Sequence, residues 1–207
     1  MSGTPPSRQI RAVFDDEVLT VYQAYGDRIA EPALRRGTFV DPFKRSRMTW
    51  IKPSFLWMMY RCGWATKPDQ ERVLAIEITR EGFEWALANA CLSHFDRTHH
   101  ATEDAWRQAL RTSPVRVQWD PERDLGLNPL SHRAIQIGLS GEAVDRYVDD
   151  WITAVRDVTP LAHEVHAAVS AGDIETARGL LPVERPYPLT DDLVGRIGRS
   201  RITGLAD

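Results

Sequence analysis

RMTWIKPSFLWMMYRCGWATK, residues 47–67, predicts a strand that turns directly into a helix. RMTWI (47–51) is a short strand candidate, and SFLWMMYRCGW (54–64) carries apolar residues at helical spacing. Ser54 is the expected N-cap of this helix, and Gly63 marks its end. The stretch holds three of the chain's seven Trp and three of its four Met. We therefore expect the helix itself to contribute mainly to the core.

The turn of this unit gathers chemical groups that suit a nucleotide. The start of the helix offers free backbone N–H groups and the positive end of the helix dipole. Lys52 adds a full charge, Ser54 adds a hydroxyl, and Trp50 offers a flat face to a ring. Together they suit a phosphate joined to an aromatic base. The alternative is that these side chains only pack.

The rest of the chain mixes strands and helices without regular βαβ alternation, which favours an α+β fold. Strands are predicted at 9–15, 72–79, 114–121 and 133–139. Helices are predicted at 17–37 (broken or kinked at Pro32), 80–92, 103–113 and 140–152 (capped by Ser140). We expect a single α+β domain over residues 8–190, with a mostly antiparallel sheet, whole or split, flanked by helices. Residues 1–7 are expected to be disordered, and residues 191–207 to form a C-terminal tail.

The charge of the chain is unevenly distributed. The net charge is −3, so the protein is not basic throughout. Between Arg28 and Lys67, nine basic residues stand against two acids, so this segment is +7 and the remainder −10. Such asymmetry favours a surface that faces a nucleotide, another phosphorylated ligand or nucleic acid. The alternative, of equal weight, is that the charges are solvated or paired with acids elsewhere.

Several classes of function lack their motifs in this sequence. There is no GxGxxG, GxxxxGK[ST], GxSxG or HExxH, which counts against dehydrogenases, P-loop NTPases, α/β-hydrolases and zincins. Cys91, His94, His99 and His100 lie close in sequence but without metal-ligand spacing, so we expect no metal. Two cysteines suit a reducing compartment, and no run of about eighteen apolar residues is present. We expect a soluble, cytoplasmic protein, and its oligomeric state is left open.

Three polar residues lie inside predicted strands. Arg11 lies in QIRAVFD, where it is costly unless paired. It is either a rim residue or one that reaches a phosphate bidentately. Gln136 lies in RAIQIGL and is either a hydrogen-bonding group in a cleft or a satisfied residue on the exposed face. Glu77, in VLAIEIT, raises the same question.

Four blocks of the sequence resemble the domain of unknown function 4291 family. They are RQIRAVFDDEVLTVYQAY (8–25), RMTWIKPSFLWMMYRCGWATK (47–67), RAIQIGLSGEAVDRYVDDWI (133–152) and LLPVERPYPL (180–189). The resemblance covers about residues 8–190. It implies no activity, because the family name carries none.

The order of these blocks is more distantly similar to ADP-ribosyltransferase-like folds, including the RNA 2′-phosphotransferases. That resemblance implies a split antiparallel sheet, an NAD-binding Arg or His on the first strand, and a Ser-containing turn beside the nicotinamide. By the same resemblance, Arg11 and Lys52 would hold the phosphates of NAD and Trp50 would stack. Ser54 would line the nicotinamide pocket, and Gln136 would occupy the catalytic position of a late strand.

The catalytic position departs from the pattern of those folds, which place a Glu there. The amide of Gln136 cannot act as a carboxylate base or stabilise a cation by charge. Either Glu142 or Glu77 supplies the carboxylate instead, or the transfer chemistry is altered or absent. We therefore expect a nucleotide-binding protein, with ADP-ribosyltransferase-like use of NAD as one hypothesis. The alternative is a non-catalytic nucleic-acid or nucleotide-binding module that uses the basic, aromatic-rich segment 28–67.

Overall fold

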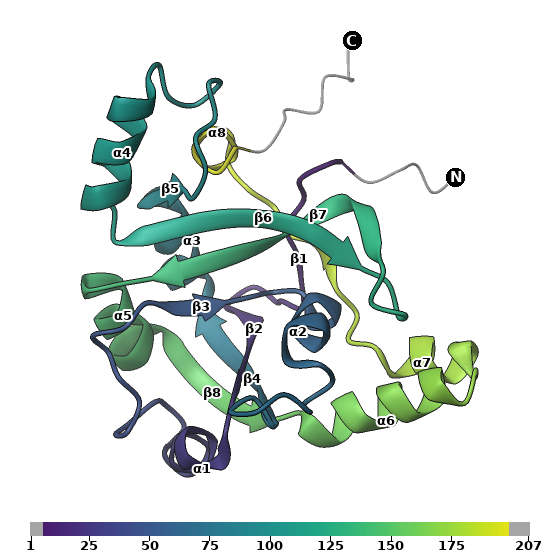
Figure 1. Ribbon diagram of the computed structural model, residues 1–207. Helices are drawn as coiled ribbons and strands as arrows, with labels where there is room; N and C mark the ends of the chain where they lie inside the picture. Colours follow the sequence, from purple (N-terminus) through teal and green to yellow (C-terminus); the bar gives the residue numbers. More distant parts are fainter. Residues whose placement is uncertain (1–5, 199–207) are drawn as a thin grey trace.

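Two β-sheets that meet at one corner form the centre of the molecule (Figure 1). A computed structural model describes residues 6–198. One sheet has the strand order β2-β4-β8, the other has the order β3-β7-β6-β5, and β1 pairs with β9. The strands are β1 (Arg11–Ala12), β2 (Val18–Tyr25), β3 (Thr49–Ile51), β4 (Arg72–Thr79), β5 (Ala90–Leu92), β6 (Val115–Arg123), β7 (Pro129–Leu139), β8 (Ile152–Asp157) and β9 (Arg185–Pro186). Among these strands, only β5 and β6 pair in parallel, so the predicted α+β fold with mostly antiparallel pairing is confirmed. Of the two alternatives left open, a whole or a split sheet, the structure has the split one.

Helices pack around the two sheets. They are α1 (Asp27–Arg36), α2 (Phe55–Cys62), α3 (Arg80–Ala88), α4 (Glu103–Thr112), α5 (Glu142–Arg146), a π-helical turn (Tyr147–Trp151), α6 (Thr159–Ser170), α7 (Ile174–Leu180) and α8 (Asp191–Arg196). Helix α2 lies between the sheets, in contact with β2 and β6 (Figure 1). The larger hydrophobic cluster joins residues of both sheets with α3 and α5, and a second cluster joins α2 with α6 and α7. None of the helices within residues 6–198 has the length and apolar character needed to cross a bilayer.

The predicted strand–turn–helix unit forms as expected. Ser54 caps α2, because its Oγ accepts a hydrogen bond from the backbone N–H of Trp57 at 3.1 Å. Gly63 ends the helix in the left-handed conformation, with φ of 60°. Met58 and Met59 are buried in the second cluster. The helix is therefore mostly packing, and the turn before it carries the polar groups.

The turn is also the point where the two sheets are joined. The backbone N–H of Tyr22 in β2 donates to the backbone oxygen of Lys52 at 2.8 Å, as an isolated β-bridge. Figure 1 shows β3 and α2 lying between the β6–β7 pair and the strands β4 and β8. Groups on this turn are consequently held by both sheets.

The helix predicted from residue 17 onward is wrong over its first half. Residues Val18–Tyr25 form β2, which pairs with β4 along its whole length. Its β-branched and aromatic residues fit a pleated, buried surface better than a helix. Asp15 does not open a helix: its Oδ1 accepts from the N–H groups of Glu17 and Val18, both at 2.8 Å, and shapes a hairpin turn. Helix α1 begins only at Asp27.

Other boundaries differ from the predictions at element ends. The helix predicted to reach residue 92 stops at Ala88, because Ala90–Leu92 form β5. Ser140 does not cap α5; its hydroxyl donates to the Pro114 oxygen at 3.0 Å, and Gly141 is the N-cap. The expected tail contains α8, and residues 1–5 and 199–207 lie outside the described part, including most of the segment predicted to be disordered.

Candidate functional site

A small cavity of about 190 Å³ opens beside the start of α2, and we call it the turn cavity. Its polar lining includes Arg11, Ser54, Glu122, His132 and Glu184. Arg11 comes from β1, Ser54 from the turn, Glu122 from β6, His132 from β7, and Glu184 from the segment before β9. Two of the residues singled out in the sequence, Arg11 and Ser54, thus meet at one place.

The start of α2 is occupied by a carboxylate of the chain itself. The backbone N–H of Phe55 donates to Glu184 Oε1 at 2.7 Å. Ser54 Oγ donates to Glu122 Oε1 at 2.8 Å while it caps the helix. The Glu184 carboxyl therefore fills the start of α2, and a bound phosphate on this turn stays a prediction.

The two carboxyl groups at the turn are held away from water and close to each other. The pKa of Glu184 is raised to about 8, mainly by burial and also by the neighbouring charge of Glu122, against the opposing effects of the Phe55 N–H and Arg11. Burial also raises the pKa of Glu122, although Arg123 N–H and Ser54 bond it. A pair of carboxyls with raised pKa values in one cavity is typical of a functional site.

Arg11 lies beside this pair and is held by backbone and side-chain oxygens. Its Nη2 donates to the Glu184 carbonyl oxygen at 2.8 Å, and its Nη1 donates to Gln9 Oε1 at 3.3 Å. The guanidinium therefore faces the turn cavity and retains N–H groups for a ligand.

Lys52 is a buried amine and not a surface charge. Its side chain is 6% exposed, and Nζ donates to the Trp50 oxygen at 3.0 Å. The Nζ atom lies 5.6 Å from the centre of the Trp57 ring. Desolvation lowers the pKa of Lys52 to about 7, assisted by Arg61 and opposed by Asp120. Contact between this amine and a phosphate would require a rearrangement of the turn.

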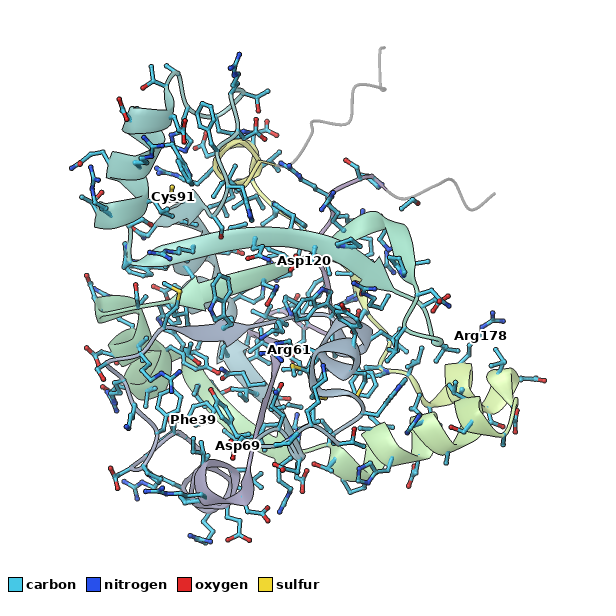
Figure 2. All side chains as sticks on the ribbon, in the orientation of Figure 1. Phe39, Arg61, Asp69, Cys91, Asp120 and Arg178 are labelled. Atoms are coloured by element: carbon cyan, nitrogen blue, oxygen red, sulfur yellow. The ribbon has the colours of Figure 1, made fainter. Side chains whose placement is uncertain are left out.

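Gln136 lies mid-strand in β7 and is 8% exposed. Its amide donates to Asp120 Oδ2, and the Gln118 amide donates to the other oxygen at 2.9 Å. In Figure 2, Asp120 lies below β6, on the side of the sheet where α2 carries Arg61. Gln136 therefore sits in a hydrogen-bonded row with a carboxylate at its centre.

Trp50 shares the face of the sheet that carries Gln136. It pairs with Gly138, two residues along β7 from Gln136, and successive side chains of a strand alternate between faces. The Trp50 ring covers Gly138 so closely that an added Cβ there would lie 3.0 Å from the ring. By the same alternation Lys52 points to this face, so three predicted residues line one surface.

The carboxylates proposed from the sequence to stand in for a catalytic Glu are elsewhere. Glu77 lies on β4 of the other sheet and pairs with Arg156. Glu142 is exposed on α5 and pairs with Arg146 at 2.7 Å.

The carboxylates beside Gln136 and Ser54 are Asp120 and Glu122, which sequence reasoning missed. A signal was present in VRVQWDPER. Alternate residues of a strand share a face, so Gln118 and Asp120 lie with Gln136 once β6 and β7 pair, whereas Glu122 lies at a register shift between Pro121 and Arg123. Glu184 and His132 were also missed. No local pattern in the sequence marks either residue as part of a site.

The cations of segment 28–67 differ in their ion-pair partners and in their burial. Arg35 pairs with Glu31 at 3.6 Å, and Arg45 binds Asp149 through both guanidinium nitrogens, one of them at 2.6 Å. Lys52 is buried. Of these cations, Arg45 meets the expectation of pairing with acids elsewhere, whereas Arg35 pairs with an acid of the segment itself.

No group of three His, Cys, Asp or Glu side chains within residues 6–198 is arranged to hold a metal ion. Cys91 is buried in the middle of β5.

One comparison with known proteins gives a match. A family model described as a domain of unknown function (DUF4291) matches residues 9–187. The matched region contains every polar residue of the turn cavity, together with Trp50, Lys52 and Gln136. No curated protein sequence matches the chain.

Proposed function

Because the chain belongs to the DUF4291 family, whose description names no activity, we propose its function from its own geometry: it binds a nucleotide and transfers ADP-ribose from NAD. The observation that carries the proposal is the meeting of Arg11 and Ser54 at a cavity with two carboxyls, beside the strand that carries Gln136. The order of three elements resembles that of ADP-ribosyltransferase-like folds. These are the first strand with Arg11, the strand–turn–helix unit with Ser54, and the late strand with Gln136. The split antiparallel sheet supports the same fold assignment.

The size of the turn cavity suits one end of NAD. At about 190 Å³ it is smaller than the roughly 300–1,000 Å³ pockets that enclose whole drug-sized ligands. We therefore place the nicotinamide riboside end in the cavity and the rest of the ligand on the adjoining sheet face. Arg11 is the cation best placed to meet the pyrophosphate, since Lys52 is turned inward.

The remaining residues have roles that follow from their contacts. Ser54 offers its hydroxyl to the carboxamide or ribose, and Trp50 offers a ring face. The Gln136 amide orients the ribose hydroxyls, and Asp120, bonded to Gln136, supplies the negative charge that the amide lacks. Asp120 lines a neighbouring cavity of about 370 Å³ and not the turn cavity, so its carboxylate acts from the adjoining sheet face on positive charge that develops on the ribose.

The reaction exchanges one bond for another. NAD supplies an ADP-ribosyl group whose bond to nicotinamide breaks, with the electron pair leaving on nicotinamide. An acceptor nucleophile forms the new bond at the same ribose carbon, and its proton passes to a carboxylate of the site. Glu122, bonded to Ser54, is the nearest candidate for that proton.

A test measures NAD binding and nicotinamide release separately. Purified protein is titrated with NAD by calorimetry, and nicotinamide release is followed chromatographically with and without a cell extract as the source of acceptor. Asp120→Asn should retain NAD binding but lose about 100-fold or more in nicotinamide release, because it removes a charge used in the transition state. Asp150→Asn, which changes an exposed acid in the π-helical turn, should behave as wild type.

Two results separate the parts of the proposal. If NAD binds but no nicotinamide is released and no label reaches the extract, only nucleotide binding survives. If NAD does not bind at all, the proposal is rejected.

A second candidate function is a non-catalytic module that binds nucleic acid along segment 28–67. A backbone track needs solvent-facing cations in a row, and the segment retains Arg28, Lys44 and Arg47 as exposed cations. Binding of this kind should weaken steeply as salt is raised, whereas NAD binding in the turn cavity should change little.

A further inference from the structure

A cavity larger than the turn cavity lies beside the start of α1. It measures about 500 Å³, shares no lining residue with the turn cavity, and we call it the basic cavity. Its charged lining consists of Arg28, Lys44, Arg47 and one acid, Asp69. In Figure 2, Asp69 lies close to α1. Three cations against one acid give the cavity a positive lining.

The three cations have no protein partner within residues 6–198. Neither an ion pair nor a side-chain hydrogen bond joins Arg28, Lys44 or Arg47 to another described residue. By contrast, Arg45 of the same loop is fully engaged by Asp149. Three cations that outnumber the one lining carboxylate, Asp69, and form no ion pair with it attract an anion from solution.

The wall of the basic cavity is aromatic. Phe43 and Tyr25 both line it, with ring centres 6.1 Å apart in an edge-to-face arrangement. Phe39 stacks on one face of Phe43 at 4.5 Å, so the cavity meets the remaining surface of that ring. The Tyr25 hydroxyl is already bonded by Gln23, which fixes the wall in place.

Helix α1 adds to the positive lining. It starts at the cavity, and its N-cap residue Gly26 makes no side-chain capping bond. The positive end of the helix dipole therefore points into the same hollow as the cations.

We infer that the basic cavity binds a nucleoside monophosphate unit, with its phosphate among Arg28, Lys44 and Arg47 and its base against Phe43 and Tyr25. The volume lies within the range of roughly 300–1,000 Å³ typical of small-ligand pockets. The unit comes either from a free nucleotide or from the phosphorylated end of a nucleic-acid strand. The site is separate from the turn cavity and does not depend on NAD transfer there.

The experiment measures the affinity of wild type and variants for adenosine 5′-monophosphate by calorimetry. Arg47→Gln and Lys44→Gln change exposed residues, so both variants should fold. Each should weaken binding by about tenfold or more, since a hydrogen bond to a charged group is lost. Arg36→Gln, an exposed change at the far end of α1, should leave the affinity unchanged, and adenosine without phosphate should bind far more weakly than the monophosphate.

Oligonucleotides with and without a 5′-phosphate identify the source of the ligand. Binding that requires the terminal phosphate and is weakened by Arg47→Gln assigns the cavity to a strand end, and binding of the monophosphate alone assigns it to a free nucleotide. No binding of either probe overturns the inference. The inference is also overturned if the affinity for the monophosphate falls in Arg11→Lys but stays unchanged in the double variant Arg47→Gln, Lys44→Gln.

The same variants keep this inference distinct from NAD transfer. If wild type releases no nicotinamide but binds the monophosphate through Arg47, transfer is rejected and the basic cavity stands. If nicotinamide is released and the double variant binds the monophosphate as wild type does, transfer stands and the basic cavity is rejected.

Discussion

Replacing Glu184 with Gln should remove a pH dependence of stability that wild type possesses. The Glu184 carboxyl accepts the Phe55 N–H at 2.7 Å, and its pKa is raised to about 8 from an ordinary value of 4.5. The amide of Glu184→Gln retains an oxygen for the same N–H and resembles the protonated acid. The variant therefore keeps the cap of α2 and loses only the titration.

The magnitude follows from the difference between folded and unfolded pKa values. A raised folded-state pKa means that the stability contribution is fully present below about pH 4.5 and is lost as the pH rises through about 8. At about 1.4 kcal/mol for each pKa unit, the loss between about pH 5 and about pH 9 is roughly 4 kcal/mol. The lowered pKa of Lys52 acts in the opposite direction above about pH 7, but it is common to both proteins and cancels in their difference.

The assay is urea unfolding followed by tryptophan fluorescence at about pH 5, 7 and 9. The free energy of unfolding of wild type, relative to Glu184→Gln, should fall by roughly 4 kcal/mol across this range. Glu164→Gln, at an exposed position of α6, is the matched control and should follow wild type at every pH. If the free energies of unfolding of wild type and Glu184→Gln change in parallel with pH, the Glu184 carboxyl does not have a raised pKa and the reasoning is refuted.

Three further changes test other contacts. Lys52→Met should gain stability relative to wild type as the pH is lowered from about 10 to about 6, because the lowered pKa makes the charged amine costly when buried; an equal difference at both pH values in urea unfolding argues against this. Ser54→Ala loses the α2 cap and should lower the free energy of unfolding by about 1–2 kcal/mol, and no loss in the same assay would contradict the capping role. Gly82→Ala places a methyl group into the Trp151 ring and should cost about 3 kcal/mol, whereas Gly179→Ala, with open space around it, should be neutral or stabilising by up to about 1 kcal/mol; thermal melts of the two variants check the contrast.

Sequence reasoning located those elements whose signals are local. The Ser54 cap, the Gly63 end and the strand Arg72–Thr79 depend on neighbouring residues and were predicted correctly. Residues Val18–Tyr25 were misread because acids before an apolar run resemble a helix start, while pairing with β4 decides the outcome.

The candidate site was predicted only in part, for a physical reason. Arg11 and Ser54 were recognised from their types and places in the chain. Glu184, which fills the start of α2, lies 129 residues from Phe55 in sequence, and no periodicity spans that distance. Asp120 follows from strand alternation only when the pairing partner of β6 is known, and Glu122 lies at a register shift.

The pairing of β1 with β9 has a consequence for the order in which the protein assembles during synthesis. Strand β1 begins at Arg11, and its partner β9 begins at Arg185. Until the ribosome has released that late segment, β1 lacks this partner and the first N–H of α2 lacks Glu184. Arg11, which donates to the carbonyl oxygen of the same late residue, likewise lacks this contact until then. Full enclosure of the site waits for nearly the last described residues to emerge.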